Sequence, residues 1–250
     1  MKKEDICRFS RHLQRGMNIK IYGSGGVPIL VFPTQDAMCD NFENFGMIDT
    51  LNEEIETGQI QLFCVDTVDV ETWSNVWGDK PWRASRQEAY YNYIIEEVLP
   101  FIKETNGSDR LPIAAGCSLG GLHAAIVFFR RPELFSGMLS LSGVYDAKFF
   151  FDGWLDGVLY DNSPIDFLSN MASDHPYIKL YNEKEIILCI GQGQWEGEGH
   201  RTTAIMSDIF KAKDIKGWTD FWGYDVDHDW YWWKKQIIYF LPKLLGRDIK

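Results

Sequence analysis

Short apolar runs recur along this chain at spacings that leave room for a helix between them. Helices are expected at 41–57, at 83–104, from about 120, from about 202 and at 230–245. The apolar runs are PILVF, IQLFCV, LPIAAGC, GMLSLSG, EIILCIG and TDFWGY. Continuous apolar runs are typical of strands buried on both faces, as in parallel sheets covered by helices. The sequence therefore predicts an α/β fold with a mostly parallel, doubly wound sheet and helices on both faces.

Two further segments complete the predicted architecture. Residues 6–13 and 17–22 alternate in polarity about Arg15–Gly16, which indicates an antiparallel hairpin at a sheet edge. Residues 145–182 are rich in aromatic residues, Asp, Asn and Pro but show no clean period, as in a lid or pocket wall. A chain of 250 residues suits one domain, so we expect residues 1–250 to form a single domain carrying this insertion.

Composition excludes several classes of partner. The net charge of −11 disfavours binding to nucleic acid and to anionic membranes. The first residues lack a signal-like apolar run, and no stretch approaches the roughly 20 apolar residues of a membrane span, so a cytoplasmic location is expected. The 5 cysteines are scattered without CxxC spacing. We expect reduced thiols and no metal site.

The segment Gly116-Cys117-Ser118-Leu119-Gly120, followed by Gly121, carries the clearest chemical signal. It lies between the predicted strand LPIAA and an apolar helix, the context in which G-x-S-x-G places a nucleophilic serine on a tight turn. Glycine neighbours are needed there, because a Cβ would clash with backbone folding back past it. Ser118 is therefore the predicted nucleophile, and the Leu119 N–H is a predicted oxyanion donor.

A serine hydroxyl needs a base to accept its proton, and histidine is the usual choice. The chain has 5 histidines. His228 lies in the loop GYDVDHDW between the last predicted strand and the last helix, where the order nucleophile, acid, base places it. The others are expected to be surface, loop or packed helix residues: His12, His123, His175 and His200.

Several motifs together resemble the putative esterase family, which includes esterase D-like, enterochelin esterase-like and feruloyl esterase-like enzymes. They are GCSLGG with LHAA, then RRPELFSGMLSLSGVYD, and finally WGYDVDHDWYWW, and the resemblance spans about 28–245. It implies an α/β-hydrolase fold with Ser118 as nucleophile and His228 as base. The family has a His-Gly pair after the third strand, where this chain has Pro33-Thr34. Gln35 would then supply the second oxyanion N–H, with Thr34 or Asp36 as alternatives.

The acid of the triad is expected after a strand that precedes His228. Family members often carry an aspartate beyond the strand that ends here at Gly191, yet no aspartate occurs before Asp208. Glu196 is the predicted acid, with Glu198 second. The aspartates that flank the histidine are less suitable, because sequence neighbours generally point elsewhere: Asp225, Asp227 and Asp229.

These residues predict a serine carboxylesterase that hydrolyses a small-molecule ester or thioester through an acyl-enzyme, without a cofactor. Two alternatives use the same fold. One is acyl transfer to another alcohol by the same residues, and the other is a non-catalytic binding protein. The 10 tryptophans suit either aromatic pocket walls or core packing. The sequence predicts no particular ester and no oligomeric state.

Overall fold

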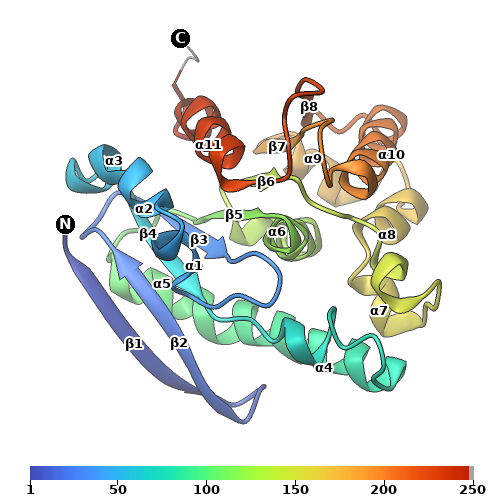
Figure 1. Ribbon diagram of the computed structural model, residues 1–250, viewed down its shortest axis with the longest axis horizontal. Coiled ribbons are helices and arrows are strands. Elements are labelled where there is room, and N and C mark those ends of the chain that lie inside the picture. The colour runs from blue at the N-terminus through green and yellow to red at the C-terminus, as the bar shows by residue number, and fades with distance from the viewer. Residues whose placement is uncertain (248–250) are drawn as a thin grey trace.

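The computed structural model describes residues 1–247 and contains an eight-stranded sheet (Figure 1). The strand order is β1-β2-β4-β3-β5-β6-β7-β8. From β3 to β8 the strands are parallel, whereas β1 and β2 form an antiparallel hairpin at one edge. The strands are β1 (Lys3–Ser10), β2 (Arg15–Tyr22), β3 (Val27–Phe32), β4 (Ile60–Val65), β5 (Ile113–Cys117), β6 (Gly137–Leu141), β7 (Glu185–Ile190) and β8 (Trp218–Phe221).

The central strands are buried on both faces because their side chains alternate between two helix layers. In β3, Leu30 and Phe32 join one apolar cluster, whereas Ile29 and Val31 join the other. This is the continuous apolar pattern that a parallel sheet between helices requires. The predicted doubly wound α/β architecture, with its N-terminal antiparallel hairpin, is confirmed.

Helices cover both faces of the sheet. One layer contains α4 (Lys80–Tyr93), η2 (Ile94–Val98), α5 (Leu99–Asn106), α6 (Leu119–Arg130) and α10 (Gly197–Lys213). The other contains α1 (Asn41–Asn44), α2 (Met47–Thr50), α3 (Asn52–Glu56) and α11 (Trp230–Leu244). Short 3₁₀ turns lie at η1 (Asp69–Glu71) and η3 (Pro132–Leu134).

The segment 145–182 forms four short helical elements, η4 (Ala147–Phe151), α7 (Gly157–Asp161), α8 (Pro164–Asn170) and α9 (Pro176–Tyr181). Its apolar side chains join the cluster beneath α4, α6 and α10, and Figure 1 shows α7 and α8 beside α4 and α10. Arg83 of α4 holds this segment against the helix layer, since its buried guanidinium donates to the Phe150 carbonyl at 2.9 Å. Much of the insertion is therefore built into the helix layer.

Several predicted boundaries were wrong. The hairpin turns at 11–14 and not at Arg15–Gly16, because Gln14 adopts the left-handed φ of 55° and Arg15–Gly16 already belong to β2. The single helix predicted at 41–57 is broken into α1, α2 and α3, and Gly46 at φ 71° interrupts it. The helix predicted from Thr202 begins earlier, at Gly197.

The helix predicted at 83–104 is longer, and a π turn divides it. It begins at Lys80 because the Asp79 side chain accepts from the Trp82 N–H. The π turn at Ile94–Val98 precedes Pro100, which has no N–H to continue the α-helical pattern.

The described residues also bear on cysteine chemistry and membrane insertion. All five cysteines are free thiols, and Cys7 is the exposed one. Within residues 1–247, no helix combines the length and the apolar content that a membrane crossing requires.

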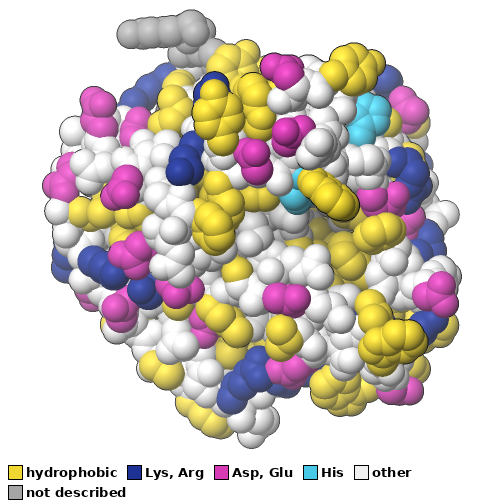
Figure 2. Space-filling model, viewed as in Figure 1, with side chains coloured by type: hydrophobic (Ala, Val, Ile, Leu, Met, Phe, Trp, Pro, Cys, Tyr) yellow, Lys and Arg dark blue, Asp and Glu magenta, His cyan; other side chains and the backbone are white. Residues whose placement is uncertain are grey.

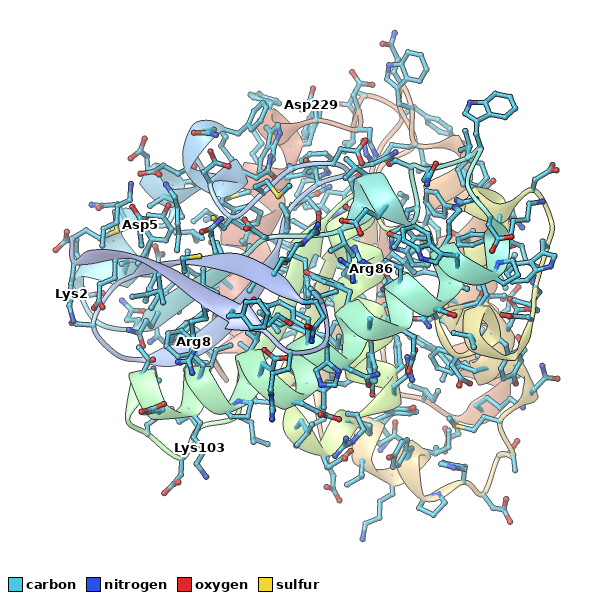
Figure 3. All side chains as sticks on the ribbon, turned by 90° about the horizontal axis from the view of Figure 1, so that it is seen from below. Lys2, Asp5, Arg8, Arg86, Lys103 and Asp229 are labelled. Carbon is cyan, nitrogen blue, oxygen red and sulfur yellow. The ribbon has the colours of Figure 1, made fainter. Side chains whose placement is uncertain are left out.

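A carboxylate on α1 anchors the hairpin. Glu43 accepts from Lys3 at 2.6 Å, Lys20 at 3.0 Å and the Tyr22 hydroxyl at 3.1 Å. These contacts, led by Lys3, lower the Glu43 pKa from 4.5 to about 2. Along the same hairpin, Figure 3 shows Arg8 on β1, where it packs over an aromatic ring of α5.

We predict that Glu43→Gln lowers the melting temperature at pH 7. A depressed pKa means that the ionised carboxylate stabilises the fold above about pH 4.5 and that this stabilisation is lost as pH falls toward 2. The difference in melting temperature from wild type should therefore shrink over that interval, as followed by circular dichroism. Glu53→Gln on exposed α3 is the control and should show no such difference. A wild-type advantage that stays constant down to pH 2 would contradict the assignment.

Candidate active site

Ser118 lies on the turn between β5 and α6, with φ of 58° and ψ of −126°. Few residues other than glycine adopt a positive φ, and such strain is characteristic of functional sites. The Ser118 N–H donates to the Leu141 carbonyl of β6 at 2.8 Å, which holds the turn against the sheet. The side chain is therefore presented at the carboxyl ends of the strands by a strained but anchored backbone.

Glycines make this turn possible. A Cβ on Gly116 would lie 2.3 Å from the Gly120 backbone, and one on Gly120 would lie 2.4 Å from the Phe32 carbonyl and 2.5 Å from that of Pro33. No real Cβ sits that close to backbone atoms. The N-terminus of α6 can thus approach the ends of both β3 and β5.

Ser118, His228 and Glu196 form one hydrogen-bonded chain. His228 Nε2 lies 2.8 Å from Ser118 Oγ, and His228 Nδ1 lies 2.9 Å from Glu196 Oε2. Glu196 is 1% exposed, whereas the imidazole side chain is 22% exposed. The structure brings together the three side chains that the sequence predicted as nucleophile, base and acid.

Backbone contacts join the loop that carries the acid to the loop that carries the base. The Gly193 N–H donates to the Val226 carbonyl at 2.9 Å, and the His228 N–H donates to the Gln194 carbonyl at 3.0 Å. Asp227 adds a third contact, because its carboxylate accepts from the Gln194 N–H at 2.6 Å. Asp227 therefore supports the loops and does not orient the imidazole.

The other candidate carboxylates have different partners. Glu198 forms a bidentate ion pair with Arg201, with N···O distances of 3.0 and 2.6 Å. Asp229 caps α11 by accepting from the Trp232 N–H at 3.2 Å, and Asp225 is exposed. Among the described carboxylates, the Glu196 side chain alone lies within hydrogen-bond distance of the His228 ring.

The remaining histidines each contact a partner away from Ser118. Their partners are Glu96 for His12, Asp69 for His123, the Tyr177 N–H for His175 and the Phe221 ring for His200. His123 was expected to be a packed helix residue. It is buried, and its Nε2 lies 2.8 Å from the equally buried Asp69 carboxylate. This pair joins α6 to η1.

Three candidate oxyanion donors have a backbone N–H without an acceptor among residues 1–247. They belong to Leu119, at the start of α6, and to Gln35 and Asp36, in the turn after β3. Thr34, an alternative to Gln35, already donates its N–H to Asn41 Oδ1 at 3.0 Å. Asp36, the other alternative, adopts the left-handed φ of 60° in the same turn.

The thiol next to Ser118 belongs to Cys117 and carries no charge. Cys117 points into the apolar cluster on the α11 side of the sheet, and burial raises the pKa of its thiol well above the ordinary value. It stays neutral at physiological pH and does not compete with Ser118. Within the described part of the chain, no group of three or more His, Cys, Asp or Glu side chains could hold a metal ion.

A surface cavity of about 290 Å³ lies against the acid loop. It is lined by Gln192, Gly193, Glu196, Gly197, His200 and Tyr224. Trp195 and Tyr224, 88% and 83% exposed, project from the loops that follow β7 and β8. Figure 2 shows hydrophobic side chains next to histidine on this face. Part of the tryptophan content is thus displayed at the carboxyl ends of the strands.

Sequence reasoning missed two side chains that contact the predicted acid and base. Ser142 donates to Glu196 Oε1 at 2.6 Å, and the Trp233 ring meets the His228 ring edge to face with centroids 4.9 Å apart. They lie in the segments LSLSGVYD and WYWW, which carry the family resemblance. Those segments were the available signal, but neither side chain was assigned a role.

This chain matches one protein-family model and is similar to several solved structures. A model of the family described as putative esterase matches residues 10–244. A search of curated proteins finds no match. The chain is similar to the structure of a ferulic acid esterase, with 14% identity, a TM-score of 0.75 and 98% of each chain covered.

Two further solved structures are similar. An S-formylglutathione hydrolase from Agrobacterium tumefaciens is 16% identical with a TM-score of 0.75, covering 98% of this chain and 95% of that one. The enterobactin esterase of Shigella flexneri is 19% identical with a TM-score of 0.65, covering 98% of this chain and 60% of that one. At these identities the likeness shows the fold.

We predict that Gly120→Ala destabilises the protein by about 1–3 kcal/mol, because the new methyl group has backbone carbonyls on two sides and no room to move. Urea unfolding measures the effect. Gly157→Ala is the control, since a Cβ there meets no atom within 4 Å. A Gly120→Ala variant as stable as wild type would show that α6 does not need this close approach.

Proposed function

The chain belongs to the putative esterase family, has the α/β-hydrolase fold and is a serine hydrolase, and we propose that it cleaves a carboxylic ester or thioester through an acyl-enzyme on Ser118. The observation that carries this proposal is the hydrogen-bonded chain from Ser118 Oγ through the His228 ring to Glu196. Each group in it has the chemistry that acyl transfer needs.

In the proposed first half-reaction, Ser118 Oγ attacks the carbonyl carbon while His228 Nε2 takes the hydroxyl proton. The imidazolium that forms keeps its Nδ1–H directed at Glu196 Oε2. A buried carboxylate holds the imidazole in the tautomer that has a free Nε2 lone pair, and it stabilises the positive charge. His228 then protonates the leaving alcohol or thiol as the bond to the acyl group breaks.

The negative charge that develops on the carbonyl oxygen needs donors that are already in place. We take the N–H groups of Leu119 and Gln35 as these donors: neither has an acceptor among the described residues, Leu119 directly follows Ser118, and the start of α6 packs against Pro33, which leads into the turn that contains Gln35. The free N–H of Leu119 also lies at the positive end of α6. Thr34 is a poor donor because Asn41 already accepts its N–H.

In the second half-reaction, water replaces the alcohol. His228 takes a proton from water, the resulting hydroxide attacks the acyl carbonyl, and Ser118 leaves with the proton returned by His228. The partial exposure of His228 supports this step, because water can reach Nε2 once the first product has departed. No cofactor is needed. The names of the similar structures point to both oxygen esters and thioesters as substrates to test.

We predict that Ser118→Ala lowers kcat for p-nitrophenyl acetate and butyrate at least about 1,000-fold. Its circular dichroism spectrum should match wild type, because the hydroxyl contributes little packing. His228→Ala should behave in the same way, since the nucleophile would then lack its base. A series of oxygen esters and one thioester, with graded acyl and alcohol sizes, completes the substrate set.

His200→Ala is the matched control. His200 lines the neighbouring cavity but contacts the Phe221 ring instead of Ser118, so this variant should keep turnover within a few-fold of wild type. Activity of Ser118→Ala within tenfold of wild type would remove Ser118 as the nucleophile. An inactive His200→Ala beside an active His228→Ala would reassign the base.

A further inference from the structure

Ser142 occupies an unusual position directly after β6. Its side chain is fully buried, and its φ of 55° lies in the left-handed region that favours glycine. The Ser142 N–H donates to the Cys189 carbonyl of β7 at 2.8 Å, so the conformation is anchored on the neighbouring strand. A non-glycine residue held this way carries backbone strain, which calls for a physical account.

The hydroxyl of Ser142 lies between two groups of opposite hydrogen-bonding character. It accepts from Trp233 Nε1 at 2.9 Å and donates to Glu196 Oε1 at 2.6 Å. The indole N–H can only donate, and an ionised carboxylate can only accept. The direction of both bonds is therefore settled, and the hydroxyl proton points at Glu196.

This bond completes the surroundings of a buried carboxylate. Glu196 Oε1 accepts from Ser142 and, at 3.4 Å, from the Gly191 N–H, which leaves Oε2 for His228. No lysine or arginine forms an ion pair with Glu196 among the described residues. A hydrogen bond to a charged acceptor is worth more than a neutral one, and losing it in a buried site costs more.

Trp233 contacts both Ser142 and the His228 ring. Trp233 donates to Ser142, and the edge-to-face contact between its ring and the His228 ring has an interplanar angle of 84°. It is 3% exposed, so its position is set by packing. The end of β6, the acid loop and the start of α11 therefore meet in one network.

We propose that Ser142 is a positioning residue, which holds the Glu196 carboxylate in the orientation that leaves Oε2 aimed at His228 Nδ1. This proposal rests on the proposed function of Ser118, His228 and Glu196. The Ser142 side chain is fully buried, so its proposed effect on catalysis passes through its bond to Glu196 and not through contact with substrate. Its removal should lower kcat while leaving KM nearly unchanged.

The test replaces the hydroxyl in two ways and measures kcat and KM with p-nitrophenyl acetate. Ser142→Ala keeps a Cβ, whereas Ser142→Gly removes the backbone strain as well, so a loss shared by both does not come from a change in that strain; the circular dichroism spectrum and melting temperature of each variant show whether it folds. Each should lower kcat about 10- to 100-fold, the size expected for a charge-assisted bond in a buried site. Ser140→Ala is the matched control: Ser140 is equally buried, but its hydroxyl contacts Tyr145, and its kcat should stay within threefold.

A double-mutant cycle separates positioning from general structural support. In a Glu196→Gln background, adding Ser142→Ala should change kcat less than twofold, because the carboxylate through which it acts is gone. In a Glu198→Gln background, the full 10- to 100-fold loss should remain, since Glu198 pairs with Arg201 instead.

An equal loss in all backgrounds would overturn the proposal, and so would full activity of both Ser142 variants. These outcomes differ from failure of the proposed function. In that case, wild-type protein would hydrolyse none of the esters, or its activity would survive Ser118→Ala.

Discussion

The close approach of the α6 N-terminus to the ends of β3 and β5 is the packing constraint on which the rest of the site depends. Gly116 and Gly120 allow it, because a side chain at either position would overlap backbone atoms. In this turn Ser118 has a positive φ, and the start of α6 lies against the carbonyls of Phe32 and Pro33, where the turn that contains Gln35 begins. One steric condition thus accounts for a partly exposed hydroxyl at the strand ends and for the free Leu119 N–H directly after it.

The second half of the site depends on two loops that follow β7 and β8. Neither loop is regular, yet backbone bonds between 191–194 and 223–228 make them a unit. That unit carries Glu196 into the interior while keeping part of the His228 ring accessible. A carboxylate buried without a cation would be costly, and its hydrogen bonds from Ser142, the Gly191 N–H and His228 offset that cost.

The pattern of neighbouring residues predicted the central strands and the turn at Ser118. Continuous apolar runs identified the central strands, and the glycines around Ser118 identified the turn, because both follow from burial and sterics within a few residues. Element boundaries were harder to predict. The break at Gly46 and the π turn before Pro100 were missed because amphipathic spacing continues through both segments.

Sequence reasoning predicted some long-range contacts of the site but not others. The order of chain elements favoured His228 and Glu196, and the structure places both within reach of one another. Ser142 could not be recognised, because its bond to Glu196 joins residues 54 positions apart and depends on a conformation that serine rarely adopts. A nucleophile and a base can be recognised from motifs in the sequence. A residue that orients the acid can be recognised only from its contacts in the structure.

The most direct test of the central claim is to identify the residue that a fluorophosphonate modifies. Ser118 Oγ should displace fluoride at phosphorus, with its proton passing to His228, and intact-mass spectrometry should show one added phosphonyl group. Peptide mapping should locate that group on Ser118, and His228→Ala should slow the labelling strongly. A protein that stays unlabelled, or that carries the group on another residue, would contradict the account.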